Sequence, residues 1–285
     1  MREVGGQVTH QVGRFSVTAA VTFGPRLVGL VPEGGPDLLV RLGPDIGVDD
    51  GNGGVFRFRG GHRLWLSPEV PEVTYSPDDA PCVVTYAEGR MNVEGVVDGA
   101  GFIKELTVSA EEDRLVVDHR ATWTGVEPIT VGAWAITQVP LGGRAILPLG
   151  SPGDGTELKA DRSLVLWPFT RLTDQRLSMA EDAVLIETVP GGRLKLGSGP
   201  TPGSIGYLHE GWLFTKSVGA ATDLDYPDRG AVAQVFTNED FCELESLGPL
   251  RRLQSGGSIE HREVWCAARC PDRETALARL VGTSS

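Results

Sequence analysis

Two glutamates that lie two residues apart are the strongest candidates for chemistry in this chain. They occur in the segment FCELESLGPL, which begins at Phe241. Successive residues of a strand point to opposite faces, so Phe241, Glu243 and Glu245 share one face while Cys242 and Leu244 share the other. Carboxylates placed in this way lie about 6.5–7 Å apart, and each raises the pKa of the other. The pattern indicates either a general base in a wet cleft or an ordinary solvated strand face.

The segment GGHRLW offers a second group of candidates. Its two glycines allow the backbone to pass close to a ligand, and Trp65 has a flat apolar face that can stack on the C–H side of a sugar. In an extended chain Arg63 and Trp65 share a face and His62 points the other way. We take His62 as a candidate catalytic residue and Arg63 and Trp65 as candidate substrate contacts. The alternative is a core tryptophan with the arginine and histidine at its edge.

Two further cations are candidate ligand contacts. In GWLFTKS, Lys216 shares a strand face with Trp212 and Phe214, and it can hold a carboxylate or phosphate or lie exposed on a strand. Arg26 lies in GPRL near the amino terminus. If Arg26, Arg63 and Lys216 converge in this chain of net charge −12, they indicate an anionic ligand.

These residues are carried by segments with the pattern of strands. The 38 glycines and 19 prolines divide the chain into short runs that alternate in polarity and are rich in β-branched residues, such as RLVVDHRATW, ITVGAWAITQV and IEHREVWCAA. Within the first of these runs we expect His119 on a solvated face. The stretch 226–228 reads as a turn. One segment, PDRETALARLVG, has a helical pattern, with Asp272 able to cap its amino end.

The fold class that follows is all-β. We predict a single domain, residues 1–285, built as a large antiparallel β-supersandwich with one short C-terminal helix. The glycine-rich stretches at residues 43–61 and 150–161 are expected to be irregular loops.

Composition narrows the classes of function. The net charge of −12 argues against nucleic acid and against an anionic membrane surface as partners. Neither a secretory signal nor a long apolar stretch is present, so we expect a cytoplasmic protein. No serine-nucleophile elbow, phosphate loop, dinucleotide fingerprint or zinc-protease motif occurs. The cysteines read as buried free thiols, with a metal or disulfide role as the alternative; they are Cys82, Cys242, Cys266 and Cys270.

Three segments in order carry a family resemblance. They are FGPRLVGLVPEGGPDLL at 23–39, FRGGHRLWLSPE at 58–69, and the stretch at 225–265 that contains the two glutamates. Together they resemble the galactose mutarotase-like superfamily, specifically an uncharacterised bacterial branch rather than the true aldose 1-epimerases. The resemblance implies a β-supersandwich with a concave sugar-binding face. In true mutarotases a carboxylate takes a proton from the anomeric hydroxyl and a histidine protonates the ring oxygen. Glu245 matches that carboxylate best, and Glu243 is the runner-up.

The central part of the chain departs from the true enzymes. They carry an Asn-His-x-x-Phe-Asn motif where this chain has VGAWAITQVPLGG, without a histidine. Trp134 and Gln138 in this stretch are retained as candidate sugar contacts, although neither can act as a general acid near neutral pH. The sequence therefore predicts a carbohydrate-binding protein for a sugar or an anionic sugar derivative, with no cofactor and no metal. It is either an aldose 1-epimerase-type isomerase with a glutamate base or a non-catalytic binding protein.

Overall fold

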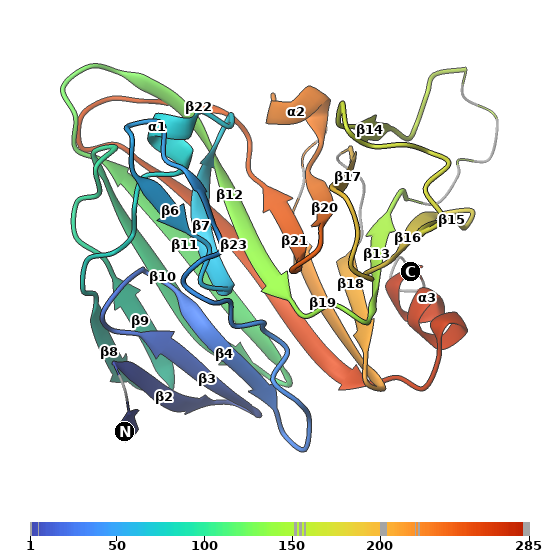
Figure 1. Ribbon diagram of the computed structural model, residues 1–285, viewed down its shortest axis with the longest axis horizontal. Coiled ribbons are helices and arrows are strands. Elements are labelled where there is room, and N and C mark those ends of the chain that lie inside the picture. Colours follow the sequence, from blue (N-terminus) through green and yellow to red (C-terminus); the bar gives the residue numbers. More distant parts are fainter. Residues whose placement is uncertain are drawn as a thin grey trace.

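Two large antiparallel sheets stack face to face in this protein (Figure 1). The computed structural model describes residues 2–4, 6–150, 153, 156, 158–199, 204–219, 221 and 223–281. Of the loop predicted at residues 150–161, positions 151, 152, 154, 155 and 157 lie outside the described residues.

The first sheet has eleven strands within the described residues. In spatial order they are β1 (Arg2–Val4), β2 (Gln7–Val12), β3 (Phe15–Ala20), β4 (Leu27–Pro32), β7 (Gly61–Ser67), β12 (Ile129–Val139), β21 (Cys242–Leu247), β20 (Ala233–Thr237), β17 (Leu194–Ser198) and β14 (Leu164–Leu166), with β22 (Arg251–Leu253) paired to one end of β12.

The second sheet has ten strands in the described part of the chain. Their order is β15 (Leu177–Met179), β16 (Ala183–Glu187), β13 (Arg144–Pro148), β18 (Ser204–His209), β19 (Trp212–Val218), β23 (Ser258–Arg269), β11 (Arg114–Trp123), β10 (Phe102–Glu111), β9 (Arg90–Glu94) and β8 (Val83–Ala87). Near the centre of the first sheet β12 pairs with β21, and near the centre of the second β11 pairs with β23, so segments far apart in the sequence build one sandwich.

The remaining elements are short. The predicted loop at residues 43–61 contains a ribbon of β5 (Gly47–Asp49) and β6 (Val55–Arg57) and then enters β7. The predicted C-terminal helix is α3 (Arg273–Val281), whose first turn is capped by Asp272 through its Oδ1 and the Thr275 N–H, 2.8 Å apart. The four-residue helix α1 (Pro71–Thr74) was not predicted. The segment α2 (Pro227–Gly230) has left-handed backbone angles at Asp228 and Arg229, so it is a turn, in agreement with the turn predicted at residues 226–228. The all-β prediction is confirmed.

The main core lies between the sheets, because one face of each alternating strand is apolar. A second cluster packs α3 against the outer face of the second sheet and includes Leu185 and Leu280. All four cysteines are free thiols, and three of them are buried. No helix in the described residues is both long and apolar enough to cross a membrane.

The alternation also corrects one expectation. His119 was predicted to lie on a solvated face, but only 2% of it is exposed. It shares its side of β11 with Val117 and Ala121, which face the core, whereas Asp118 and Arg120 point outward.

Candidate functional site

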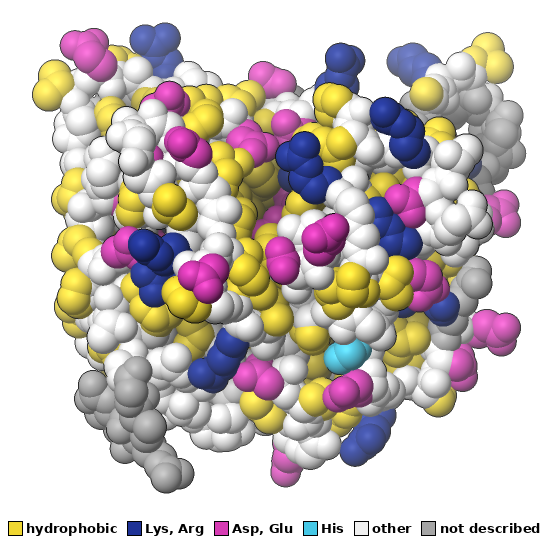
Figure 2. All heavy atoms as spheres, in the orientation of Figure 1, with side chains coloured by type: hydrophobic (Ala, Val, Ile, Leu, Met, Phe, Trp, Pro, Cys, Tyr) yellow, Lys and Arg dark blue, Asp and Glu magenta, His cyan; other side chains and the backbone are white. Residues whose placement is uncertain are grey.

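A cleft with aromatic walls lies on the face of the first sheet that turns away from the second sheet. Its volume is about 260 Å³. β7, β12, β21, β20 and β17 form its floor, and the ribbon β5–β6 and α1 border it. In Figure 2 it opens in the upper central part of the face, between hydrophobic and acidic side chains. The aromatic residues that line it are Phe58, Trp65, Tyr75, Trp134, Trp167, Phe169, Phe236 and Phe241.

Glu243 presents its carboxylate to this cleft. One carboxylate oxygen, Oε1, accepts hydrogen bonds from Arg63 Nη2 and Gln138 Nε2, each at 3.0 Å. The other oxygen, Oε2, has no protein partner in the described part of the chain. Gln138 lies directly opposite Glu243 in the register of β12 and β21, which explains the short contact. The carboxylate is therefore held in place with one oxygen left for a ligand.

Arg63 acts on the cleft through Glu243. Its guanidinium lies 4.1 Å from the centre of the Trp65 ring, and the two residues share one face of β7 as predicted. Burial lowers the pKa of Arg63 to about 10, and the neighbouring Glu243 opposes that change. The side chain therefore stays positively charged at neutral pH and supports the carboxylate. It does not itself line the cleft.

Glu245 lies beneath the cleft surface. Its Oε2 accepts hydrogen bonds from Lys195 Nζ at 2.8 Å and from Trp134 Nε1 at 2.7 Å. The residue is completely buried. Burial raises the pKa of Glu245 to about 7, an effect opposed by Lys195 and reinforced by Glu243. The predicted common face of Phe241, Glu243 and Glu245 is confirmed, but only the first two line the cleft.

Lys195 is a cation of the cleft that the sequence did not reveal. Its ammonium lies 4.6 Å from the centre of the Trp134 ring and 4.7 Å from that of Trp167. In RLKLG, Leu194 and Leu196 point into the core, so strand alternation turns Lys195 to the other face of the sheet. This alternation is the one local feature of the sequence that indicates the direction of Lys195. Nothing in the segment indicates that β17 pairs with β20, which in turn pairs with β21.

His62 and Lys216 lie outside the cleft. Both are buried between the sheets: His62 lies on the inner face of the first sheet, opposite to the face of Glu243, and Lys216 reaches that inner face from β19 of the second sheet. The physical reason is strand alternation: His62 points away from Arg63, and Lys216 points inward with Phe214. The interpretation of His62 as a cleft acid and of Lys216 as a ligand contact is therefore corrected, and the expected convergence of three cations on the cleft is absent.

Arg26 is a support for one wall of the cleft. It is fully buried, pairs with Asp78 at 2.6 Å, and donates to the carbonyl oxygens of Phe58 at 2.7 Å and Gly60 at 2.8 Å. Phe58 lines the cleft, so Arg26 fixes that wall from behind. Of the predicted substrate contacts, Trp65 and Trp134 line the cleft, while Arg26, Arg63 and Gln138 stand behind it.

The cleft combines flat apolar walls with a carboxylate and an ammonium group on different strands. Glu243 and Lys195 each lie in register with Phe236, so their backbones are separated by two inter-strand spacings, about 9.5 Å. Long side chains from such positions can reach two sides of one small polar ring. Among the described residues that line the cleft there is no histidine.

Comparison with known proteins shows which solved structures have a similar fold. No family model matches the chain, and no curated protein matches it. Solved structures do: a galactose mutarotase-like protein from Lactobacillus casei is 11% identical with a TM-score of 0.59, covering 92% of this chain and 100% of its own. A candidate aldose 1-epimerase from Escherichia coli K12 is 14% identical with a TM-score of 0.54, covering 93% and 100%.

A third similar structure is a candidate mutarotase from Salmonella typhimurium. It is 11% identical with a TM-score of 0.56, and the match covers 94% of this chain and 92% of that one. At such identities the similarity concerns the fold. The predicted galactose mutarotase-like β-sandwich is confirmed.

Proposed function

We propose that the cleft binds a carbohydrate and that Glu243 and Lys195 exchange its anomers in an aldose 1-epimerase-type reaction. One observation carries the proposal: Glu243 is held through a single oxygen in an aromatic cleft that also contains Lys195. The galactose mutarotase-like fold adds support, because solved proteins of this fold are named as a galactose mutarotase-like protein and a candidate mutarotase.

A sugar ring suits the shape and chemistry of the cleft. Its C–H faces are apolar and match the flat surface of the half-buried Trp167, while its hydroxyls need polar partners at the ring edge. Glu243 accepts hydrogen bonds there and Lys195 donates them. The cleft volume of about 260 Å³ is close to the lower end of the usual range for small-molecule sites, which favours a monosaccharide.

The proposed reaction needs two proton transfers. Glu243 takes the proton from the anomeric hydroxyl while the Lys195 ammonium gives a proton to the ring oxygen. The bond between C1 and the ring oxygen breaks, and C1 becomes an aldehyde. Rotation about the bond between C1 and C2 exposes the other face of the carbonyl. Closure returns both protons and leaves the protein unchanged.

The two glutamates have different roles in this scheme. Glu243 is assigned as the base, because its open oxygen faces the cleft, whereas Glu245 is covered. Glu245 instead orients Lys195 through their 2.8 Å contact and acts as its counter-charge. This reverses the order in which the family resemblance ranked the two residues.

A non-catalytic sugar-binding role is the second candidate. It is favoured by the lack of a histidine among the described residues that line the cleft, because a lysine ammonium is a weaker acid than an imidazolium. The two functions share the same ligand class and differ only in turnover.

Saturation-exchange NMR over a panel of aldoses tests the proposal. Catalysis is expected to appear as magnetisation transfer between the anomers of at least one sugar above the rate without protein. Saturation-transfer difference spectra on the same samples report binding. Binding without exchange supports the second candidate, and no binding to any sugar contradicts both.

Trp167 provides a test of ligand binding that leaves the proposed acid–base pair in place. This half-buried residue lines the cleft, and Trp167→Ala is expected to weaken sugar binding roughly tenfold through loss of its stacking surface. Trp123→Ala is the matched control, because Trp123 is also half-buried but lies on the second sheet. Equal loss of affinity in both variants, measured by titration calorimetry, would contradict the placement of the sugar.

Arg193 tests whether the ligand is anionic. It is exposed at the cleft, 4.7 Å from the centre of the Phe169 ring. If the sugar carries a phosphate or carboxylate, Arg193→Ala is expected to weaken its binding roughly threefold to tenfold. The neutral parent sugar is expected to bind unchanged. Arg114→Ala, an exposed cation on β11, should affect neither ligand. Equal effects of Arg193→Ala on both ligands would argue for a neutral substrate.

A further inference from the structure

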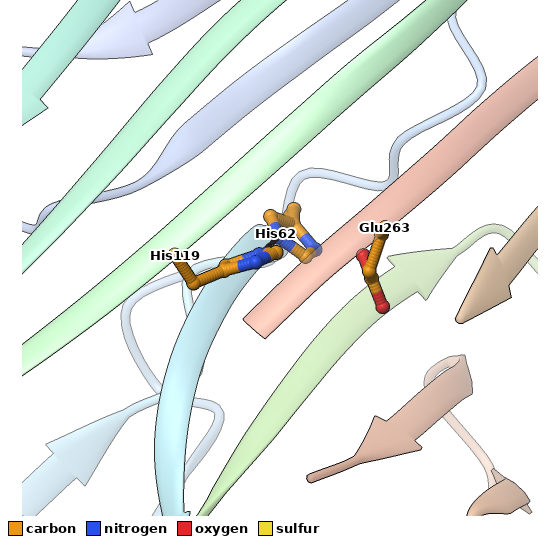
Figure 3. A group of neighbouring side chains, drawn as sticks. All are labelled: His62, His119 and Glu263. Atoms are coloured by element: carbon orange, nitrogen blue, oxygen red, sulfur yellow. Dashed lines mark hydrogen bonds between the residues drawn. The ribbon is translucent and has the colours of Figure 1, made fainter. Parts of the chain in front are cut away.

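A buried polar network lies between the sheets, directly behind the cleft. Two histidines face each other in it, His62 from the first sheet and His119 from the second, with their Nε2 atoms 2.7 Å apart and Glu263 beside them (Figure 3). Lys216 contacts Glu263 at 2.7 Å, and both residues are completely buried. Such a group is costly to bury unless each of its polar atoms has a partner.

The hydrogen bonds define one consistent set of proton positions. His119 Nδ1 lies 2.8 Å from the carbonyl oxygen of His261 and must donate to it. In a neutral ring its Nε2 then accepts, so His62 Nε2 donates. His62 Nδ1 must therefore accept from the Thr137 hydroxyl at 2.9 Å. Thr137 in turn accepts from Lys216 Nζ at 3.1 Å. Both histidines are neutral in this scheme, and burial lowers the pKa of each.

The ion pair at the end of this chain is also satisfied. Glu263 accepts from Lys216, from the Ser246 hydroxyl and from Trp265 Nε1. Burial raises the pKa of Glu263, but the positive charge of Lys216 opposes burial, and that pKa lies well below its usual range. The network therefore contains one positive and one negative charge.

A metal ion fits this site less well than the ammonium group does. The ligand atoms of His62, His119 and Glu263 lie within 4.8 Å of one another. Tetrahedral zinc, with nitrogen ligands at about 2.0–2.1 Å, places two such nitrogens about 3.3 Å apart, more than the 2.7 Å found here. A second cation would also lie beside Lys216, which already binds Glu263.

The network contacts the strands of the cleft floor from behind. Lys216 Nζ donates to the carbonyl oxygens of Ala135 at 3.2 Å and Leu244 at 3.1 Å. Leu244 lies between Glu243 and Glu245 in the sequence, and Ala135 follows Trp134. His62 and Thr137 likewise precede Arg63 and Gln138. Each contact thus fixes a backbone position next to a residue that points to the opposite face.

We propose that Lys216, Glu263, His62 and His119 form a positioning network that fixes β7, β12 and β21 from behind and so sets the place and ionisation of two glutamates, Glu243 in the cleft and Glu245 beneath it. The proposal rests on the proposed function only in taking these glutamates as the working groups. Lys216 is a positioning residue in this scheme, because it touches no ligand.

Glu245 is the carboxylate on which this network should act most. The charged or polar groups around it are Lys195 from β17, Glu243 on its own strand, Trp134 and Gln234 on the flanking strands, and Lys216 behind the sheet. Without Lys216, the negative Glu263 is left uncompensated. The anionic form of Glu245 then becomes less favourable, and its titration moves to higher pH.

The indole N–H of Trp134 reports this titration, because it donates to Glu245 Oε2. In ¹⁵N–¹H spectra recorded against pH, the Trp134 signal of Lys216→Met is expected to move with a midpoint roughly one pH unit above that of the native protein. Leu185→Ala is the control for lost stability, because Leu185 packs beside α3, away from the cleft. Its Trp134 midpoint should match the native value.

The double variant Lys216→Met/Glu263→Gln keeps the test decisive if the single variant does not fold. It leaves no unpaired buried charge, and its midpoint is expected between those of the native protein and the single variant. If the Trp134 midpoint of Lys216→Met equals the native value, the proposal is overturned. If only the double variant folds, a native midpoint in the double variant overturns it. An equal shift in Leu185→Ala, or one equivalent of tightly bound zinc in the purified protein, overturns it too. No sugar is present in these measurements, so they succeed or fail independently of the proposed function.

Discussion

Replacing Glu243 by glutamine is expected to lower the rate of anomer exchange by about 10²- to 10⁴-fold, the usual contribution of one general base. Glutamine keeps the size of the side chain, and its carbonyl oxygen can still accept hydrogen bonds from Arg63 and Gln138. The variant lacks only the basic oxygen, so sugar affinity should change by less than a few-fold. A selective loss of turnover would identify the base.

The measurement is saturation-exchange NMR on the best sugar of the aldose panel, with affinity measured on the same samples. Glu260→Gln is the matched control, since Glu260 lies exposed on β23 of the second sheet, and its rate should equal that of the native protein. Glu245→Gln is expected to lower the rate less than Glu243→Gln, because Glu245 acts through Lys195. If Glu245→Gln abolishes exchange and Glu243→Gln does not, the assignment of the base must be reversed.

Strand alternation made the local part of the site predictable from the sequence. The faces of Phe241, Glu243 and Glu245, and the opposed directions of His62 and Arg63, follow from the period of two and are found in the structure. The same period also holds for His119, which lies on the same strand face as Leu115 and Val117. Its polar character led to a solvated placement, whereas the apolar neighbours on its own face indicate the core.

Strand pairing could not be predicted in this way. The acidic strand β21 lies between β12 and β20, and β17 lies one strand further. Because β12 is more than a hundred residues away in the chain, no local pattern brings Trp134 beside Glu245 or Lys195 within 2.8 Å of it. The assignment of Glu245 as the exposed base depended on this missing information, since it is Lys195 and Trp134 that cover it.

The stability of the protein is expected to fall steeply as the pH drops below about 6.5. His62, His119 and His261 are buried, and burial lowers the pKa of each, in the case of His261 to about 3. The unfolded chain binds protons on all three near pH 6.5, whereas the folded chain does not. A histidine whose pKa is lower in the folded protein than in the unfolded chain stabilises the fold at pH values above its unfolded pKa. This stabilisation is lost as the pH falls below that value.

Glu245 and Glu263 modify this dependence in opposite directions. The pKa of Glu245 is raised to about 7, so between about pH 4.5 and 7 the folded protein holds one proton that the unfolded chain lacks. Unfolding takes up at most three protons on the histidines and releases this one, so the unfolding free energy falls by at most about 2.7 kcal/mol per pH unit near pH 5.5. Below about pH 4.5 the unfolded chain also protonates Glu263, whose pKa is depressed in the folded state, and the loss becomes steeper.

Urea unfolding between pH 7.5 and 4.5 measures this slope. His119→Gln is expected to reduce it by one proton, about 1.4 kcal/mol per pH unit. Leu185→Ala should lower the free energy of unfolding by about 2–5 kcal/mol at every pH and leave the slope unchanged. A flat dependence between pH 6.5 and 5 would mean that the folded protein accepts these protons. Because one proton bridges His62 and His119 in their 2.7 Å contact, a pair with both rings protonated would have to separate. The neutral hydrogen-bond chain behind the cleft would then be wrong.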